Sequence, residues 1–145
     1  MNELVLVPLD KSHLTVLQVW FKDSESQWVD EPSAQFVDYV GSQPNYYVWM
    51  VYDENLPVAY VGYEIAVDQT AGVMIVVSPE HRKRGYGKRT LQAIASRPEV
   101  KSIKALTADI RPKNEASVRC FRSAGYVDRD SPYEGHVRLG HQISA

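Results

Sequence analysis

The chain has 145 residues, 44% of them hydrophobic, which is enough to bury the core of one domain. Its 16 Lys and Arg against 18 Asp and Glu give a formal net charge of −2, a balance that argues against a dedicated DNA- or RNA-binding protein. The single cysteine, Cys120, excludes an internal disulfide. No apolar run approaches the roughly 20 residues of a membrane span, and the first residues do not resemble a signal peptide. We therefore expect a soluble cytoplasmic protein with no membrane or nucleic-acid partner.

The first third of the chain predicts a strand, two helices and a loop between the helices. An apolar run predicts the strand, and apolar side chains at helical spacing from Lys11 onward predict the first helix, with Ser12 as its N-cap. Ser33 is expected to cap the second helix, which Gly41 ends. The bounds of the strand, the loop and the second helix are 4–9, 22–33 and 34–40.

The rest of the chain predicts strands interrupted by two helices. Three runs in the middle are rich in aromatic, β-branched or other apolar residues, and the third, "AGVMIVV", is expected to be a central strand buried on both faces. The expected strands are 45–54, 58–68 (after a turn at 54–57), 71–77, 102–109 and two within 125–130 and 134–143, and the helices are 86–97 and 114–125, the latter ending at Gly125. The pattern describes one mixed α/β domain over residues 1–145.

A basic, glycine-containing segment follows the third of these runs. Five of the nine residues from His81 to Arg89 are Lys or Arg, and Gly85 and Gly87 lie among them. A strand, then such a loop, then a helix favours anion binding, because the first amides of a helix have no intrahelical partner and glycines allow a ligand close to the backbone. A pyrophosphate suits this chemistry, although the segment alone also fits a solvated basic turn. It is not a Walker A loop, and the pattern G-x-G-x-x-G fails at Thr90.

Two motifs together resemble the GNAT superfamily of N-acetyltransferases. R-x-x-G-x-G, directly after a strand that ends in Val-Ser-Pro (77–79), resembles the family's acetyl-CoA loop, and N-x-x-[AS] before a helix and G-[FY] resembles its later signature. The matching residues are Arg82, Gly85 and Gly87 for the first motif, and Asn114, Ser117, Gly125 and Tyr126 for the second. The N-terminal part is similar to the branch that contains ribosomal-protein N-terminal and polyamine acetyltransferases. The resemblance implies an α/β (α+β) domain with a mixed, mostly antiparallel sheet of about seven strands and about four flanking helices.

The resemblance also implies that acetyl-CoA is the co-substrate. Its pyrophosphate is expected on the amides from Arg82 to Lys88, and its pantetheine arm is expected to pair like an added strand with Ile75–Val77. Asn114 is expected beside the pantetheine or the ADP portion, and capping the following helix is an equally good role for it. The residues implied to contact acetyl-CoA are Ile75, Val76, Val77, Arg82, Lys83, Arg84, Gly85, Tyr86, Gly87, Lys88, Asn114 and Phe121.

The catalytic groups depart from the family's pattern. The resemblance implies that the backbone N–H of Val77 polarises the thioester carbonyl. Many members protonate the leaving thiolate with a Tyr, but Phe121 stands at that place and has no proton to give. The strand 71–77 also lacks the carboxylate that often serves as the base. The nearest carboxylates are those of Glu64, Asp68 and Asp109. We expect Glu64 to act, because it interrupts an apolar strand.

Several functions remain open at this point. The first is N-acetylation of a small-molecule amine or a peptide N-terminus; an α-amine, with a pKa of ~8, suits a site without an obvious base better than a Lys amine at ~10.4. The second is a non-catalytic acyl-CoA-binding module, which the missing Tyr and carboxylate favour. The third is a nucleic-acid-binding domain, which would need a broader basic surface than this composition provides.

Fewer signals bear on the acceptor and on other ligands. Five aromatic residues are candidates for the acceptor pocket, with core packing as the alternative: Trp20, Trp28, Tyr46, Tyr47 and Trp49. The four His residues show no metal-ligand spacing, so no metal is expected. His136 falls in an expected strand and is interpreted as structural. A homodimer is left open.

Overall fold

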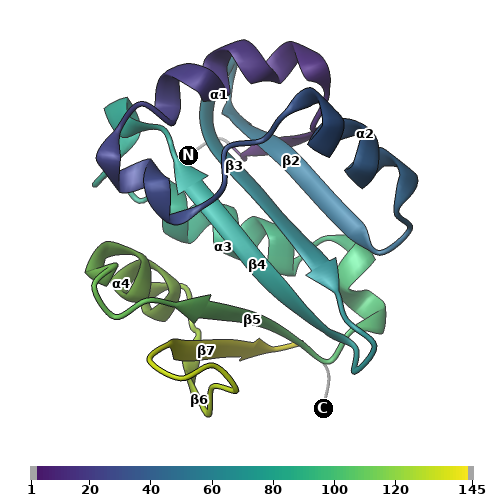
Figure 1. Cartoon of the computed structure of the whole chain (residues 1–145), viewed down its shortest axis with the longest axis vertical. Coiled ribbons are helices and arrows are strands. Elements are labelled where there is room, and N and C mark those ends of the chain that lie inside the picture. Colours follow the sequence, from purple (N-terminus) through teal and green to yellow (C-terminus); the bar gives the residue numbers. More distant parts are fainter. Residues whose placement is uncertain (1–2, 144–145) are drawn as a thin grey trace.

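A computed structural model describes residues 3–143, which form a sheet with α helices on both of its faces (Figure 1). The strands are β1 (Val5–Pro8), β2 (Tyr46–Asp53), β3 (Leu56–Ile65), β4 (Thr70–Val77), β5 (Ala105–Ile110), β6 (Val127–Arg129) and β7 (Val137–Gln142). The α helices are α1 (Leu14–Trp20), α2 (Ala34–Ser42), α3 (Tyr86–Ala95) and α4 (Glu115–Ser123). Four short 3-10 helices are η1 (Lys11–His13), η2 (Ser24–Trp28), η3 (Pro79–His81) and η4 (Pro98–Ser102).

The sheet has seven strands in the order β1-β2-β3-β4-β5-β7-β6. Neighbouring strands run antiparallel except β4 and β5, which are parallel. Their connection contains α3, since parallel neighbours need a crossover that brings the chain back to the same end of the sheet. The predicted fold class, with its mixed and mostly antiparallel sheet, is confirmed.

Two apolar clusters hold the helices on opposite faces of the sheet. On one face Leu17 of α1 packs with Met50 and Tyr60 of the central strands. On the other face Leu91 of α3 and Phe121 of α4 share a cluster with strand residues. Figure 1 accordingly shows α2 in front of the sheet and α3 behind it. Each fully buried side chain of this size contributes about 1.5–3 kcal/mol, so both helix layers are fixed to the strands that border the pocket described below.

Three local signals act as the sequence predicts. The Ser33 hydroxyl accepts a hydrogen bond from the Phe36 amide (3.1 Å) at the start of α2. The Asn114 side chain accepts one from the Ser117 amide (3.3 Å) at the start of α4. Gly125 follows α4 with a φ of 95°, the left-handed conformation of a C-terminal glycine.

Two local predictions are wrong. Ser12 is not the N-cap of the first helical segment: the Asp10 carboxylate accepts from the Ser12 amide (2.8 Å), and His13 Nδ1 accepts from the Asp10 amide (3.0 Å), which makes a capping box. Gly41 does not end α2, which continues to Ser42. The reason is that Gly41 does not adopt a positive φ, so it is an ordinary helical residue.

Some element bounds also differ from the sequence prediction. The predicted loop 22–33 contains the helical turn η2. The turn predicted at 54–57 is shorter, because β3 already begins at Leu56. The strand predicted from Ser102 begins at Ala105, since Ser102 still belongs to η4.

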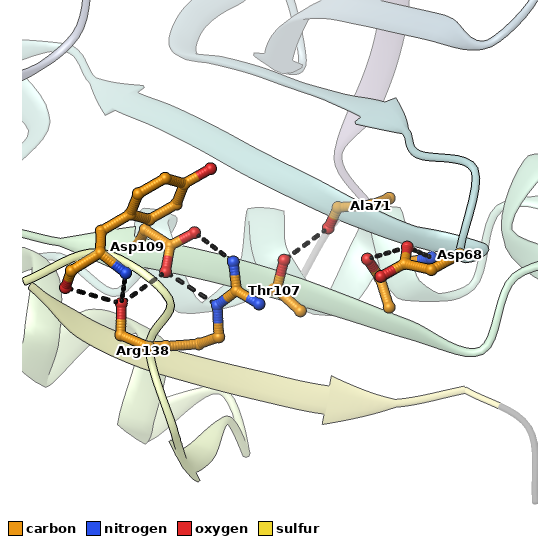
Figure 2. Close-up of polar contacts among 8 residues, drawn as sticks. Asp68, Ala71, Thr107, Asp109 and Arg138 are labelled. Atoms are coloured by element: carbon orange, nitrogen blue, oxygen red, sulfur yellow. Dashed lines mark hydrogen bonds and ion pairs between the residues drawn. The ribbon is translucent and has the colours of Figure 1, made fainter.

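The prediction that the third run is buried on both faces is wrong, because β4 separates from β5. The two strands pair only through the first three residues of β4 in the sheet as described, ending at Gly72 opposite Thr107. At that point the Thr107 hydroxyl donates to the Ala71 carbonyl (3.4 Å; Figure 2). Beyond it Val73 and Ile75 are only partly buried. The divergence opens a pocket between the two strands.

Candidate active site

A pocket of about 1060 Å³ borders the part of β4 that has separated from β5. Its walls come from residues between 28 and 36, the strands β2 to β5, the segment 81–88, α4 with the residues that precede it, and His136. A volume of this order suits an extended cofactor together with a small second substrate, since single-ligand pockets measure roughly 300–1000 Å³.

The backbone of β4 presents one hydrogen-bonding edge to this pocket. The Ser78 amide donates to the Val58 carbonyl of β3 (2.9 Å), so residues of this parity direct their backbone groups toward β3. By alternation, the backbone groups of Val73, Ile75 and Val77 point away from β3, toward the gap left by β5. All three residues line the pocket. An extended ligand can therefore pair with this edge as an added strand does.

The segment after β4 turns sharply before α3 begins. Gly85, the residue before the helix, has a φ of 83°, a conformation that costs a residue with a side chain about 1–2 kcal/mol. Gly87 lies against α4: a Cβ added there would stand 2.5 Å from Cys120 Sγ. Glycine is therefore required at the two positions for different reasons: at Gly85 because of its backbone conformation, and at Gly87 because a side chain would clash with Cys120.

Positive groups and unpaired helix amides surround this turn. The amides of Tyr86, Gly87 and Lys88 belong to the first turn of α3, where no intrahelical carbonyl is available to them. Lys83 and Lys88 line the pocket beside them, whereas Arg84 is exposed and does not line it. This combination of amides, helix dipole and cations can hold an anionic group.

Arg82 connects this turn to the segment that precedes α2. Its guanidinium donates to the Asp23 carboxylate and to the buried Ser26 hydroxyl (3.1 Å). Because η2 lies on that segment, the contact fixes the residues that follow it on the opposite wall of the pocket. The sequence motif alone gives no sign of this second role.

Tyr86 anchors the start of α3 to the end of β2. Its hydroxyl donates to the Asp53 carboxylate (2.5 Å), and this hydrogen bond is the main cause that raises the pKa of Tyr86. The Arg89 guanidinium lies over the Tyr86 ring at 5.4 Å from its centroid. The contacts hold the helix N-terminus in position at the pocket.

The α4 side of the pocket is mostly apolar. Phe121 is 2% exposed and meets Tyr126 edge to face with ring centroids 4.9 Å apart. Cys120 also lines the pocket, and burial raises the pKa of its thiol. Asn114 lines the pocket while it caps α4. At the position of Phe121, this wall offers no acidic proton.

A second wall faces the sheet from the α1–α2 side. Trp28, Phe36, Tyr46 and Tyr60 line the pocket there, with the rings of Phe36 and Tyr46 edge to face at 5.7 Å between centroids, and the exposed carboxylates of Asp30 and Glu31 line it as well. Burial is the main cause that raises the pKa of Tyr46 and of Tyr60. Of the five aromatic residues proposed for an acceptor pocket, Trp28 and Tyr46 line it. The other three, Trp20, Tyr47 and Trp49, are not among its lining residues.

A polar group closes the pocket at the end of β5. The Asp109 carboxylate, which lines the pocket, accepts two hydrogen bonds from Arg138 of β7, from Nε and Nη2 at 2.8 Å each (Figure 2). This pairing raises the pKa of the Arg138 guanidinium. His136, two residues before Arg138, lines the pocket as well.

The structure brings most of the predicted cofactor residues into this one pocket. Those that line it are Ile75, Val76, Val77, Arg82, Lys83, Gly85, Tyr86, Gly87, Lys88, Asn114 and Phe121. Arg84 is the exception. Their contacts with acetyl-CoA stay predictions.

The predicted catalytic residues lie in different places. The Val77 backbone faces the pocket, as described above. Glu64 is exposed on β3, opposite Tyr46 and Gly72, where β4 and β5 are still paired, and it is not among the pocket-lining residues. Asp68 accepts hydrogen bonds from Thr70 in the β3–β4 turn (Figure 2), and these lower its pKa. The role of Glu64 as base stays a prediction.

The sequence gives no sign that Asp30, Glu31 and His136 line the pocket. No motif marks residues 28–32, and the contacts of Arg82 with Asp23 and Ser26 that hold the preceding η2 join parts of the chain far apart in the sequence. The interpretation of His136 as a strand residue is wrong, since β7 begins one residue later. Gly135 in the preceding position, with a φ of 76°, is a signal of a turn there.

Among the side chains that the structure describes, no group of three or more His, Cys, Asp or Glu residues could hold a metal ion. Within residues 3–143, no helix is long and apolar enough to cross a membrane.

Comparisons with known proteins agree with this geometry. The model of the acetyltransferase (GNAT) family matches residues 14–126. The "Uncharacterized N-acetyltransferase YfmK" of Bacillus subtilis (strain 168) is 28% identical over 130 residues, which cover 85% of this chain and 84% of that protein.

Solved structures share the fold over almost the whole chain. The aminoglycoside acetyltransferase AAC(6')-Ib, in complex with coenzyme A and kanamycin, has a TM-score of 0.77 at 17% identity and covers 97% of this chain and 95% of its own. The spermidine N-acetyltransferase from Vibrio cholerae, in complex with CoA and spermine, has a TM-score of 0.77 at 13% identity and covers 97% and 96%. At these identities the likeness shows the fold.

Proposed function

The chain belongs to the acetyltransferase (GNAT) family, and from this premise we propose that it transfers the acetyl group of acetyl-CoA to the primary amine of a small molecule or a peptide N-terminus. Both substrates occupy the pocket beside β4, and the amine attacks the thioester directly. The observation that carries the proposal is the open edge of β4, which continues into the basic glycine turn at one end of that pocket.

The donor end of the pocket suits acetyl-CoA on three counts. The edge formed by Val73, Ile75 and Val77 offers backbone groups to an amide-containing arm such as pantetheine. The turn from Lys83 to Lys88 offers amides and cations to a pyrophosphate. A side chain at Gly87 would intrude on α4, so the close packing of this turn needs the glycine. The cofactor supplies the activated acetyl group.

The reaction uses the backbone more than side chains. The Val77 N–H points into the gap and donates to the carbonyl oxygen as negative charge develops on it. Phe121 supplies no proton to the leaving thiolate. This is tolerable because a thiol with a pKa near ~8.5 leaves as the anion without a dedicated acid.

The acceptor end favours an amine that carries more than one positive charge. Asp30 and Glu31 are exposed at this end, and the rings of Trp28, Phe36 and Tyr46 form an apolar wall beside them. Carboxylates attract cations to the pocket, and aromatic faces bind ammonium groups at about 0.5–2 kcal/mol each. Enzymes of the same fold named for spermidine and for aminoglycosides are consistent with this class.

A non-catalytic acyl-CoA-binding module is the second candidate. Phe121 in place of the acidic Tyr and the absence of a carboxylate from residues 70–77 favour it. Under this alternative the donor end binds as proposed, but no acceptor amine is turned over.

Mass spectrometry of acetylated products tests the proposal against this alternative. Purified protein and acetyl-CoA are incubated with amino acids, peptides, di- and polyamines and aminoglycosides, and the Gly85→Asp variant serves as the matched control. Acetylated amine with the wild type and none with the variant is the expected result. Acetyl-CoA binding without any product supports the non-catalytic module, and absence of both contradicts the two candidates together.

A further inference from the structure

The proposed transfer needs a proton acceptor on the acceptor side of the pocket. Most primary amines are protonated near neutral pH and cannot attack until they lose a proton. Glu64 lies outside the pocket wall, and Asp109, which lines it, already accepts two hydrogen bonds at 2.8 Å from Arg138 (Figure 2). A carboxylate held in such a two-point pair is occupied.

An imidazole lies in the same wall. His136 directly precedes β7, is partly buried, and lines the pocket. Its Nδ1 stands 3.2 Å from the backbone carbonyl oxygen of Glu134. A carbonyl oxygen only accepts hydrogen bonds, so this contact requires the proton on Nδ1. The neutral ring then carries its lone pair on Nε2, which is the form a general base needs.

The turn that carries His136 is well defined. The Tyr133 amide donates to the Ser131 hydroxyl (3.1 Å), and the His136 amide donates to the Tyr133 carbonyl (3.2 Å). The Tyr133 ring meets the imidazole at 5.8 Å between centroids. The Ser131 hydroxyl also lies 3.5 Å from Asp109 Oδ1, so the ion pair with Arg138 supports the base of the turn.

We propose that His136 is the general base of the transfer, an inference that rests on the proposed function. The ammonium form first releases one proton to water, and Nε2 then takes a second proton from the neutral amine as its nitrogen forms a bond to the acetyl carbon. The carbon–sulfur bond breaks, and its electron pair leaves with the sulfur. The imidazolium then returns its proton to the thiolate, directly or through water, so the products are the amide, the free CoA thiol and the proton already released to water. His136 thereby serves in place of both the strand carboxylate and the Tyr that Phe121 replaces.

The charged groups around His136 come from several elements. Those of its own turn and of β7 are Tyr133, Glu134 and Arg138, and those on the neighbouring walls of the pocket are Asp109, Arg111 and Arg119. None of these groups is replaced in the tests below, so a change in rate or pH profile cannot come from the loss of one of them.

His136→Asn is the first test, because the Asn side-chain amide can still donate to the Glu134 carbonyl but has no group at the place of Nε2. We expect kcat to fall by about 100-fold with the KM for the amine within about threefold, since a general base contributes roughly 10²–10⁴. The acidic limb of the pH profile of kcat/KM should disappear with the imidazole. Calorimetric affinity for CoA should stay unchanged, which also reports that the variant is folded.

Two comparisons distinguish the possible failures. Glu64→Gln tests the competing base: a loss of rate in this variant with none in His136→Asn would contradict the inference and support Glu64. A wild type that binds acetyl-CoA but acetylates no amine contradicts the proposed function, and the inference falls with it.

A readout that does not depend on turnover completes the test. Nitrogen NMR of the His136 imidazole, assigned by its absence in His136→Asn, should show the tautomer with the proton on Nδ1 at pH 8. The tautomer with the proton on Nε2 would overturn the inference even in an active enzyme.

Discussion

The two ends of the pocket offer ligands different parts of the chain. At the donor end the backbone is exposed: the free edge of β4 and the amides of a turn that contains Gly85 and Gly87. Elsewhere side chains form the walls, including Trp28 and Tyr46 at the acceptor end and His136 beside the end of β5. The donor end is built from one continuous segment, 73–88, together with α4, whereas the acceptor end joins segments that are far apart in the sequence.

This difference explains why only one end can be recognised in the sequence. A turn that must adopt a positive φ at Gly85 and leave room for Cys120 at Gly87 tolerates few residues, so it leaves a spaced glycine motif. Aromatic and acidic side chains at a wall can be supplied from many backbone positions. The acceptor end therefore leaves no motif, and its substrate can change without a change in the donor end.

The largest effect on stability is expected at the donor end, where a single added methyl group disrupts the packing of the glycine turn. Gly87→Ala places a Cβ 2.5 Å from Cys120 Sγ, which should lower the free energy of unfolding by about 1–3 kcal/mol and weaken CoA binding. The double variant Gly87→Ala/Cys120→Ala removes the sulfur and should recover most of the stability. Urea denaturation measures both. A single variant as stable as the wild type would contradict the steric role of Gly87.

The reactivity of Cys120 distinguishes a ligand bound at the donor end from one bound at the acceptor end. Burial raises the pKa of this thiol, so at pH 8 its thiolate fraction is smaller than that of an exposed cysteine, and alkylation should be slow and should accelerate as the pH rises. Saturating CoA should slow it further, by about tenfold, because Cys120 lines the pocket. A dicationic amine alone should give little protection. If the amine protected Cys120 from alkylation as well as CoA does, the amine would bind beside Cys120 and not at the proposed acceptor end.

The acceptor end can be weakened without touching the donor end. In Asp30→Asn/Glu31→Gln we expect the KM for a dicationic amine to rise about 3–10-fold at low salt, with an unchanged affinity for CoA. The effect should shrink at high ionic strength, since both carboxylates are exposed. The double variant Asp128→Asn/Asp130→Asn, which neutralises two exposed carboxylates that do not line the pocket, is the matched control. An equal increase in the control would mean that only the overall charge matters.

The smallest expected effect concerns a glycine that belongs to neither end. Gly41 lies inside α2 without a positive φ, and no atom lies within 4 Å of an added Cβ. Gly41→Ala should therefore stabilise the protein by about 0.5–1 kcal/mol in urea denaturation, with both substrates bound as before. Destabilisation would show that Gly41 ends the helix after all, as the sequence alone suggests.

The sequence predicts the helices and strands better than it predicts how they pack and pair with one another. Ser33 and Asn114 cap their helices as expected, because a cap depends only on the next three residues. Asp10 rather than Ser12 begins the first helical segment, a difference of two residues that only the capping box decides. The run at 71–77 looks fully buried, since apolar composition does not show that β5 turns away after Gly72.

The candidate site divides in the same way. All the residues expected to contact acetyl-CoA line one pocket except Arg84, which is exposed. Glu64 was chosen by its position in the strand, but register places it opposite Gly72, where the strands are still paired. His136 gains its place only through the turn at Gly135 and the pairing of β7 with β5. Such long-range pairing is invisible to local sequence patterns.

Calorimetric titration of CoA and acetyl-CoA tests the central claim, that the open edge of β4 and the glycine turn form an acetyl-CoA site. The wild type and the Gly85→Asp/Gly87→Asp variant are compared, with Gly41→Ala as a folded control. We predict that the wild type and the control bind both ligands and that the double variant loses at least about 100-fold in affinity, because it adds strain and two negative charges at the turn. A wild type that binds neither ligand, or a double variant that binds as well as the wild type, would contradict the account.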